Sequence, residues 1–176
     1  MLKANKMDTP TTYNSPLTVT AVWAALENVK DPEIPVLTVV DMGIIYGVEI
    51  SPTATTCTVT MTPTFVGCPA IDVMKQSIHE EVLKLGFDTV EVKVDFENAW
   101  TSDRMSAEAK QKLEKFGLAP PATFTGELTE AQLNNVRCPH CGSTDTTLRS
   151  AFGSTLCRAI RFCFNCKQGF EQFKPI

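Results

Sequence analysis

The sequence has little histidine and lacks the glycine-rich loops that bind nucleotides. It contains only two histidines, His79 and His140, and neither belongs to a Glu-x-x-His motif, so the chain cannot build a di-iron carboxylate site. Neither a Gly-x-Gly-x-x-Gly nor a Walker-type loop occurs, which leaves flavin, NAD and ATP chemistry unsupported. No apolar run approaches the roughly 20 residues that span a bilayer. Residues 1–16 have no apolar signal-peptide core, and we expect a disordered lead-in there.

Cysteine is abundant, but its distribution argues against a disulfide scaffold. The chain has seven cysteines, an odd number, and five of them fall within the last 39 residues. With no export signal we expect a reducing, cytoplasmic location, where paired Cys-x-x-Cys motifs indicate metal binding. With 43% hydrophobic and 20% charged residues over 176 positions, the composition is that of a soluble protein with one ordinary domain and one small one.

Two Cys-x-x-Cys pairs predict a C-terminal zinc ribbon over 137–176. Cys138 and Cys141 form the first pair, and Cys163 and Cys166 follow after an interval of 21 residues, which is long enough for a hairpin. Four thiolates close the tetrahedral shell of Zn²⁺ and leave no open position, so the ion is expected to be structural. About 40 residues cannot build a sufficient core alone, and the metal must supply the missing stability.

Other residues of the ribbon segment have expected roles that do not include zinc binding. His140 lies in the middle of the first turn and is expected to face solvent. Gly142 and Gly169 follow the two pairs and are expected to supply the positive φ that such turns need. Cys157 has three open roles, as a replacement ligand, as a free thiol near the site, or as a partner of Cys68 in transfer. Because four ligands already satisfy zinc, we expect that Cys157 is not a zinc ligand.

The net charge of −4 is distributed unevenly along the chain. Residues 1–122 carry 10 basic and 16 acidic side chains, residues 123–136 add two acidic ones, and residues 137–176 carry six basic and two acidic ones. The basic tail fits docking to an acidic partner surface or a phosphate-bearing ligand, and it equally fits a solvated face.

Hydrophobic periodicity predicts an α+β first domain over 17–118, followed by a linker over 119–136. Helical spacing indicates helices at 18–29, 70–85 and 103–116, and alternation indicates strands at 44–50, 55–62 and 90–96. The order α-β-β-α-β-α describes a small sandwich of helices on a three-stranded sheet. Within the second strand, Cys57 alternates with Val59 and Met61, so we interpret it as a core residue.

The loop from Thr62 to Pro69 contains the chemically most interesting residue, Cys68. It leads from a predicted strand into a predicted helix, where free backbone N–H groups and the helix dipole favour a thiolate. Gly67 permits a close backbone approach, and Thr62 and Thr64 are either donors to a sulfur ligand or ordinary strand-end residues. A lone cysteine is also often a small core residue, so the functional interpretation of Cys68 is not the only one at this point.

Four motifs of the chain resemble those of two known protein families. They are Asp31-Pro32-Glu33-Ile34-Pro35-Val36, Asp41-Met42-Gly43-Ile44-Ile45-Tyr46, Thr62-Pro63-Thr64 with Gly67-Cys68-Pro69, and Ala151-Phe152-Gly153-Ser154-Thr155-Leu156-Cys157. The first three resemble the SufT-like iron–sulfur assembly domain family. Together with the ribbon, the fourth resembles the PaaD family (also called PaaJ), accessory proteins of the bacterial phenylacetyl-CoA epoxidase system. The resemblance covers about residues 17–176.

The resemblance implies a site and a function. In the family the cysteine of the Gly-Cys-Pro motif is the candidate iron-binding, cluster-binding or reactive thiol, which corresponds to Cys68, and the acidic motif residues correspond to Asp31, Glu33 and Asp41. It implies an accessory factor that helps to insert iron or a labile iron–sulfur cluster into the oxygenase or the iron–sulfur reductase subunit. One cysteine cannot satisfy a cluster, so a cluster-loaded form needs ligands from a homodimer, a partner or a small thiol.

Three other functions remain open on the sequence. The first is a stoichiometric structural subunit or adaptor of the oxygenase complex. The second is a nucleic-acid-binding protein, and the third is a thiol enzyme with Cys68 as nucleophile. The acidic first domain disfavours nucleic acid, and the motif contains no histidine that would act as a base for the thiol. We therefore expect no catalysis, no nucleic-acid partner and no membrane partner.

Overall fold

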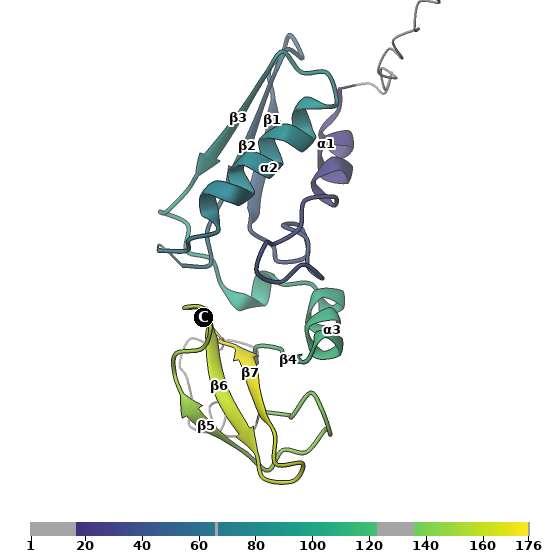
Figure 1. Cartoon of the computed structure of the whole chain (residues 1–176). Helices are drawn as coiled ribbons and strands as arrows, with labels where there is room; N and C mark the ends of the chain where they lie inside the picture. The colour runs from purple at the N-terminus through teal and green to yellow at the C-terminus, as the bar shows by residue number, and fades with distance from the viewer. Residues whose placement is uncertain (1–16, 66, 123–135, 176) are drawn as a thin grey trace, which may run out of the picture.

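The computed structural model describes residues 17–65, 67–122 and 136–175, which form two domains stacked end to end (Figure 1). The lead-in expected at 1–16 lies outside the described residues, as do residues 123–135 of the expected linker. The order of elements confirms an α+β fold with a C-terminal ribbon. No helix in the described ranges is long and apolar enough to cross a membrane.

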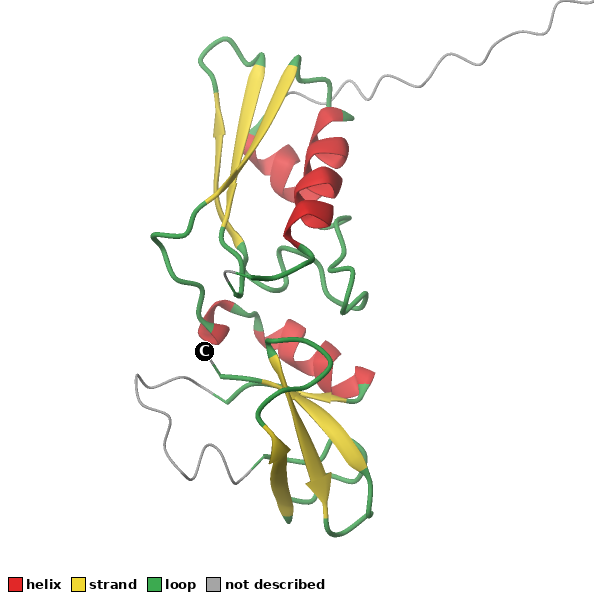
Figure 2. Cartoon of the chain, turned by 60° about the vertical axis from the view of Figure 1, so that its left-hand side comes forward, coloured by secondary structure: helices red, strands yellow, loops and turns green. Residues whose placement is uncertain are grey.

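The first domain is a three-stranded sheet with two helices on one face (Figure 2). β1 (Ile45–Ile50) and β2 (Thr56–Met61) form the expected antiparallel hairpin. β3 (Thr89–Val94) pairs with β2 in parallel after the crossover through α2 (Ile71–Leu83). α1 (Val19–Leu26) lies beside α2 and contacts β1. The middle strand of this sheet is therefore β2, which leads directly into the loop that carries Cys68.

The alternation along β2 decides which face of the sheet packs against the helices. Cys57, Val59 and Met61 are fully buried, and the threonines between them are half-buried. Because successive side chains of a strand point to opposite faces, the apolar set lies together in the core beneath the helices. Cys57 is thus a core residue, as its place in the alternation predicts.

α3 (Ala107–Phe116) connects the first domain to the second sheet. Ser106 caps its N-terminus by accepting a hydrogen bond from the Ala109 N–H at 2.9 Å, and Gly117 ends it with φ +91°. The next two residues, β4 (Leu118–Ala119), pair in parallel with Glu171 and Gln172. The chain therefore enters the second sheet already at Leu118, next to the boundary that the sequence suggests.

The second domain is a four-stranded sheet in the order β4-β7-β6-β5. β5 (Thr146–Ser150), β6 (Arg158–Cys163) and β7 (Gly169–Phe173) are antiparallel neighbours. The turn between β6 and β7 carries the second cysteine pair, and the first pair precedes β5. The long segment between β5 and β6 faces the first domain, and this segment contains Cys157.

The two domains share a buried apolar core at their junction. Phe173, at the end of β7, and Cys157 belong to the same cluster of buried residues as the core of the first domain. Trp100 packs against Phe173 with ring centroids 5.8 Å apart and donates its indole N–H to the Met42 carbonyl at 2.9 Å. The ribbon is therefore docked on the first domain by apolar burial.

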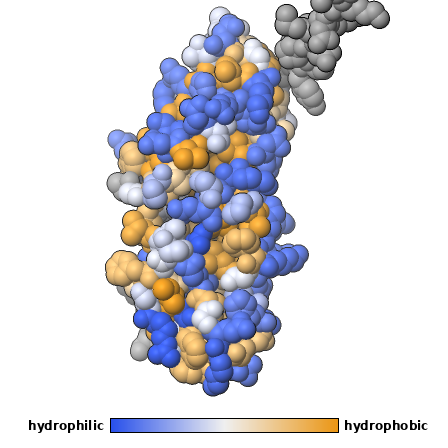
Figure 3. All heavy atoms as spheres, in the orientation of Figure 1, coloured by the Kyte–Doolittle hydropathy of each residue, from blue (hydrophilic) through white to orange (hydrophobic). Residues whose placement is uncertain are grey.

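The basic charge of the ribbon is partly internal. Arg158 and Arg161 are 8% and 1% exposed, so two of the six ribbon cations do not reach the surface. On the face shown in Figure 3, hydrophilic and hydrophobic residues are interspersed along the whole molecule. The charge difference between the two segments thus contributes less to the surface than the sequence suggests.

Candidate functional site

The four cysteines of the two Cys-x-x-Cys pairs converge on one point in the ribbon. Their sulfur atoms all lie within 4.8 Å of one another. The Sγ atoms of Cys138 and Cys166 are 3.8 Å apart, and those of Cys141 and Cys163 are 3.6 Å apart. A tetrahedral Zn²⁺ with Zn–S bonds of about 2.3 Å separates its sulfur ligands by roughly 3.8 Å. The donor set therefore fits a zinc ion without rearrangement, whereas the exposed side chain of His140 lies outside this cluster.

Equivalent backbone turns position the two cysteine pairs. In the first turn the Gly142 N–H donates to the Cys138 carbonyl at 2.9 Å, and Gly142 has φ +74°, as expected. In the second turn the Lys167 N–H donates to the Cys163 carbonyl at 3.0 Å, and Lys167 itself has φ +60°. The expectation for Gly169 is therefore wrong. The left-handed residue directly follows the last cysteine of each pair, and in the second turn this residue is a lysine.

The loop that carries Cys68 is fixed by hydrogen bonds at both of its ends. The Thr62 N–H donates to the Ile44 carbonyl at 2.8 Å, and its hydroxyl donates to the Asn98 carbonyl at 2.7 Å. The Cys68 N–H donates to the Phe65 carbonyl at 3.1 Å. Thr62 is therefore a buried structural residue whose hydroxyl donates to the backbone. Of the two motif threonines, Thr64 is the one that lies beside Cys68.

The thiol of Cys68 is not activated by its place before α2. Burial raises the pKa of the Cys68 thiol above its ordinary value, and the carboxylates of Glu33 and Asp31 and the thiol of Cys157 raise it further. The backbone N–H of Ala70 opposes this shift but does not outweigh it. The expectation of a favoured thiolate is therefore wrong. The helix begins only at Ile71, and desolvation beside acidic groups outweighs its dipole.

Alkylation of Cys68 should therefore be slow at neutral pH. The folded pKa lies above 9.0, so the thiolate fraction at pH 7.5 is below that of an ordinary cysteine, and the rate should keep rising with pH beyond 9.0. Iodoacetamide labelling followed by peptide mass spectrometry measures this rate, with the same cysteine in the denatured chain as reference. A rate that matches the denatured reference, or that levels off below pH 9, would contradict the shift.

The three acidic motif residues have separate roles. Asp31 accepts hydrogen bonds from the Glu33 and Ile34 N–H groups at 2.8 and 2.7 Å, which closes the loop after α1. Asp41 accepts from the Thr38 N–H at 3.0 Å and from the Lys112 ammonium at 2.6 Å, which ties α3 to the loop before β1. Of the three, Glu33 contributes its side chain to the surroundings of Cys68.

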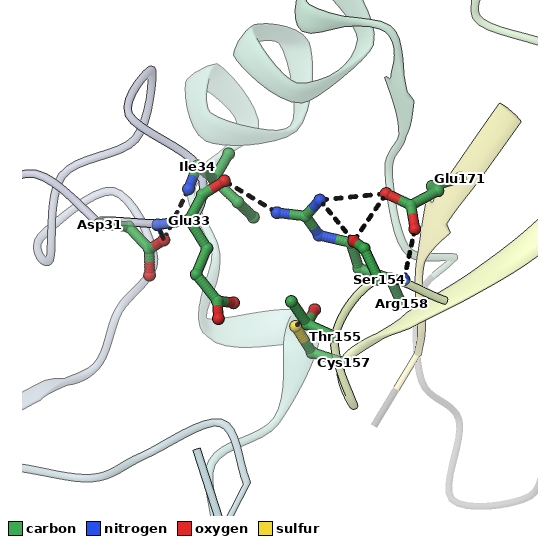
Figure 4. A network of polar contacts seen from close by, with 8 residues as sticks. All are labelled: Asp31, Glu33, Ile34, Ser154, Thr155, Cys157, Arg158 and Glu171. Atoms are coloured by element: carbon green, nitrogen blue, oxygen red, sulfur yellow. Dashed lines mark hydrogen bonds and ion pairs between the residues drawn. The ribbon is translucent and has the colours of Figure 1, made fainter. Parts of the chain in front are cut away.

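A recess at the domain junction brings together Cys68, Glu33, Thr64 and, from the ribbon, Cys157. Its volume is about 10 Å³, roughly the space of a single water molecule or ion. In Figure 4 the Glu33 side chain extends toward Thr155 and Cys157. The Thr155 hydroxyl lies 3.0 Å from the Cys157 sulfur, and burial raises the pKa of the Cys157 thiol.

Arg158 connects the two domains next to this recess. Its sequence context does not indicate this role. Its guanidinium donates to the Glu171 carboxylate at 3.0 Å, to the Ser154 hydroxyl at 3.1 Å and to the Glu33 carbonyl at 2.9 Å (Figure 4). The last bond joins the ribbon to the backbone of the acidic motif in the first domain. An arginine at the start of a strand gives no sequence signal for such a contact, because its partners are distant in the sequence.

Two family models match this chain. Residues 20–94 match the family described as iron–sulfur cluster assembly protein, and residues 123–174 match the PaaD zinc beta ribbon domain. These matches correspond to the two domains of the structure. The recess lies where the two matched regions meet.

Individual relatives extend this result to nearly the whole chain. A protein of Escherichia coli (strain K12), named as a subunit of 1,2-phenylacetyl-CoA epoxidase, is 40% identical over 163 residues, or 92% of this chain and 96% of that protein. An Fe–S protein maturation auxiliary factor of Porphyromonas gingivalis is 40% identical over 89 residues, 50% of this chain and 83% of its own. A solved structure of a conserved hypothetical protein of Thermotoga maritima is 36% identical, with a TM-score of 0.48 over 57% of this chain and 95% of that one.

Proposed function

The chain belongs to the PaaD family of phenylacetyl-CoA epoxidase proteins, and we propose that it is a non-catalytic maturation factor of that system. It would assist the insertion of iron or an iron–sulfur cluster into a partner subunit. Its similarity to assembly proteins supports an accessory role in iron or iron–sulfur handling. The surroundings of Cys68 support the more specific role in metal insertion.

The observation that carries the proposal is the recess that contains Cys68. A partly exposed thiol lies beside the Glu33 carboxylate in a space of about 10 Å³, which is too small for an organic substrate but fits one metal ion. Thiolate and carboxylate are both ligands of iron. The arrangement thus supports metal handling by the first domain.

The same recess offers little for a thiol enzyme. Neither histidine of the chain lines it, because His79 lies on α2 beside Val92 and His140 lies in the first zinc turn. A nucleophilic cysteine needs an adjacent base or a lowered pKa, and burial raises the pKa of the Cys68 thiol instead. These features support an accessory factor over an acyl-transfer enzyme.

In this proposal the ribbon has a structural role. Cys138, Cys141, Cys163 and Cys166 ligate one Zn²⁺ in a closed shell, which holds the sheet that docks on Trp100. A four-thiolate ion leaves no position for substrate or activated water. The ribbon therefore positions neighbouring groups and offers a surface to a partner.

The proposal is tested by producing the whole epoxidase system with wild-type chain, with Cys68→Ser and without this chain. We expect the iron and sulfide content of the purified oxygenase and reductase subunits to fall in Cys68→Ser to the level found without the chain. Cys57→Ala is the matched control, because it removes a buried core thiol near the start of β2, at the end of the strand away from the Cys68 loop, and Cys57 does not line the recess. Its partner subunits should keep their iron.

The alternative function is that of a stoichiometric structural subunit of the oxygenase complex. The Escherichia coli relative is named as a subunit, which favours considering this alternative. It predicts that Cys68→Ser co-purifies with the complex and leaves the iron content and the epoxidation rate of the partners unchanged. That outcome would overturn the proposal of a maturation factor and support the role of an adaptor.

A further inference from the structure

The recess at the domain junction holds a second thiol, and the ribbon supplies it. Cys157 is not part of the four-cysteine cluster, and it faces the same space as Cys68 and Glu33. Building on the proposed function, we propose that Cys68, Cys157 and Glu33 together form a binding site for one ferrous ion, the cargo of this protein. The first domain alone would supply an incomplete site, and docking of the ribbon completes it.

Backbone hydrogen bonds hold the segments of all three donors, and the bond from the Cys68 N–H to the Phe65 carbonyl serves this purpose for Cys68. The Cys157 carbonyl accepts from the Lys174 N–H at 2.9 Å, which ties the thiol to the end of β7. The backbone on either side of Glu33 is held by Asp31, which accepts from its N–H at 2.8 Å, and by Arg158, which donates to its carbonyl at 2.9 Å. The three residues come from segments that are far apart in the sequence, and they line one recess only in the docked molecule.

The charge of the recess favours a cation. The carboxylates of Glu33 and Asp31 act electrostatically on both Cys68 and Cys157, and the charge of Arg158 offsets part of this effect at Cys157 and Glu33. Two thiolates and the Glu33 carboxylate would more than neutralise a divalent ion, and such soft and mixed donor sets suit a borderline metal. The Arg158 guanidinium is directed at the Glu33 carbonyl and the Glu171 carboxylate, which keeps its hydrogen bonds away from the Glu33 carboxylate.

The size and openness of the recess suit transfer of a single ion. A volume of about 10 Å³ accommodates an ion but not a cluster. Three protein donors leave a coordination position open for a further ligand. In the described part of the chain only the ribbon cysteines already lie within ligand distance of one another, so the side chains of Cys68, Cys157 and Glu33 must turn toward a common point when iron binds. A client ligand could enter the open position and then displace the thiolates in turn. Iron stays ferrous throughout, and the thiolates take up protons as the metal leaves.

Anaerobic titration of the full-length, zinc-loaded protein with ferrous ion tests the site. The titration is made against a calibrated chelator with a phosphine reductant present. We expect one ferrous ion per chain beyond zinc, and a loss of affinity of about 100-fold or more in both Cys68→Ser and Cys157→Ser. Glu33→Gln should weaken binding about tenfold, whereas its control Glu49→Gln, at an exposed position on β1, should not. Zinc content and thermal unfolding verify that each variant is folded.

Cobalt(II) at a saturating concentration provides a second readout, which reports the number of bound thiolates. Thiolate-to-cobalt charge-transfer absorption scales with the number of bound thiolates, so each single cysteine variant should lose about half of the wild-type signal. The absorption of the Cys68→Ser/Cys157→Ser double variant is subtracted as the blank, because any cobalt that it binds is held by the ribbon cysteines. A full signal or unchanged iron affinity in Cys157→Ser would overturn the cross-domain site and leave the proposed function intact. If no chain binds iron while maturation still requires Cys68, the ferrous site fails and the proposed function stands.

Discussion

Removal of zinc is expected to unfold the ribbon while the three-stranded domain stays folded. Structural zinc contributes on the order of 10 kcal/mol to folding in comparable small domains. The separate buried cluster of the ribbon has five residues, and two of these, Cys138 and Cys163, are thiols of the metal site. The remaining apolar burial cannot replace the metal, so the apo ribbon should lose its sheet.

Trp100 reports this unfolding directly, because it packs on Phe173 at the end of the ribbon. In a Trp23→Phe background it is the remaining tryptophan of the chain, and its emission should shift to longer wavelength on chelation. Amide resonances of 146–173 should collapse in the same titration, and those of the first domain should stay dispersed. This independence follows from the main core cluster, which is built almost entirely from first-domain residues.

Cys163→Ser and Cys157→Ser form a matched pair for this prediction. Both remove one ribbon thiol, but only Cys163 belongs to the four-sulfur cluster. We expect Cys163→Ser to lose zinc and the ribbon fold, and Cys157→Ser to keep one zinc per chain and a folded ribbon. Dispersed ribbon resonances in metal-free protein would show that the sheet holds without the ion.

The sequence predicts those features that depend on local spacing. Hydrophobic alternation located β2 and its buried Cys57, and helical periodicity located α2 within two residues of each end. The two Cys-x-x-Cys pairs are equally local, since each fixes two ligands within one turn. Such patterns are visible because the partners are close in sequence or share a regular period.

Features that depend on docking were not predictable in the same way. The convergence of Cys157 with Cys68 requires the ribbon to pack on the first domain through Trp100 and Phe173, and no period in the sequence encodes that contact. The raised pKa of the Cys68 thiol depends on docking as well. Burial is its largest cause, and the carboxylate and thiol neighbours that raise it further come from other segments, whereas the sequence shows only the helix that follows.

Loss of the Arg158 guanidinium is expected to destabilise the docked ribbon strongly. Arg158→Met keeps the aliphatic part of the side chain but removes the bonds to Glu171, Ser154 and the Glu33 carbonyl. The side chains of Arg158 and Glu171 are 10% and 28% exposed, and removing one partner of such a largely buried ion pair costs roughly 2–4 kcal/mol. Chemical denaturation of the zinc-loaded protein, followed by Trp100 emission, measures this cost.

The pH dependence distinguishes this network from simple packing. Burial alone would raise the pKa of Glu171, but hydrogen bonds from the Ser154 N–H and from Arg158 outweigh it, and the net pKa is lowered below 4.5. The contribution of Glu171 is therefore fully present above pH 4.5 and is lost as the pH falls through the folded pKa. Arg158→Met should lose stability at neutral pH and show a smaller further loss on acidification than wild type.

Arg149→Met is the matched control, because Arg149 lies on the same sheet and stacks on the Phe162 and Phe164 rings at 5.1 and 5.8 Å. Each exposed cation–π contact is worth about 0.5–1 kcal/mol, so this variant should lose less stability than Arg158→Met and keep its acid sensitivity. If Arg158→Met and Arg149→Met cost the same, the guanidinium of Arg158 does not hold the two domains together. The docking would then rest on Trp100 and Phe173 alone, and the position of Cys157 beside Cys68 would depend on that apolar contact.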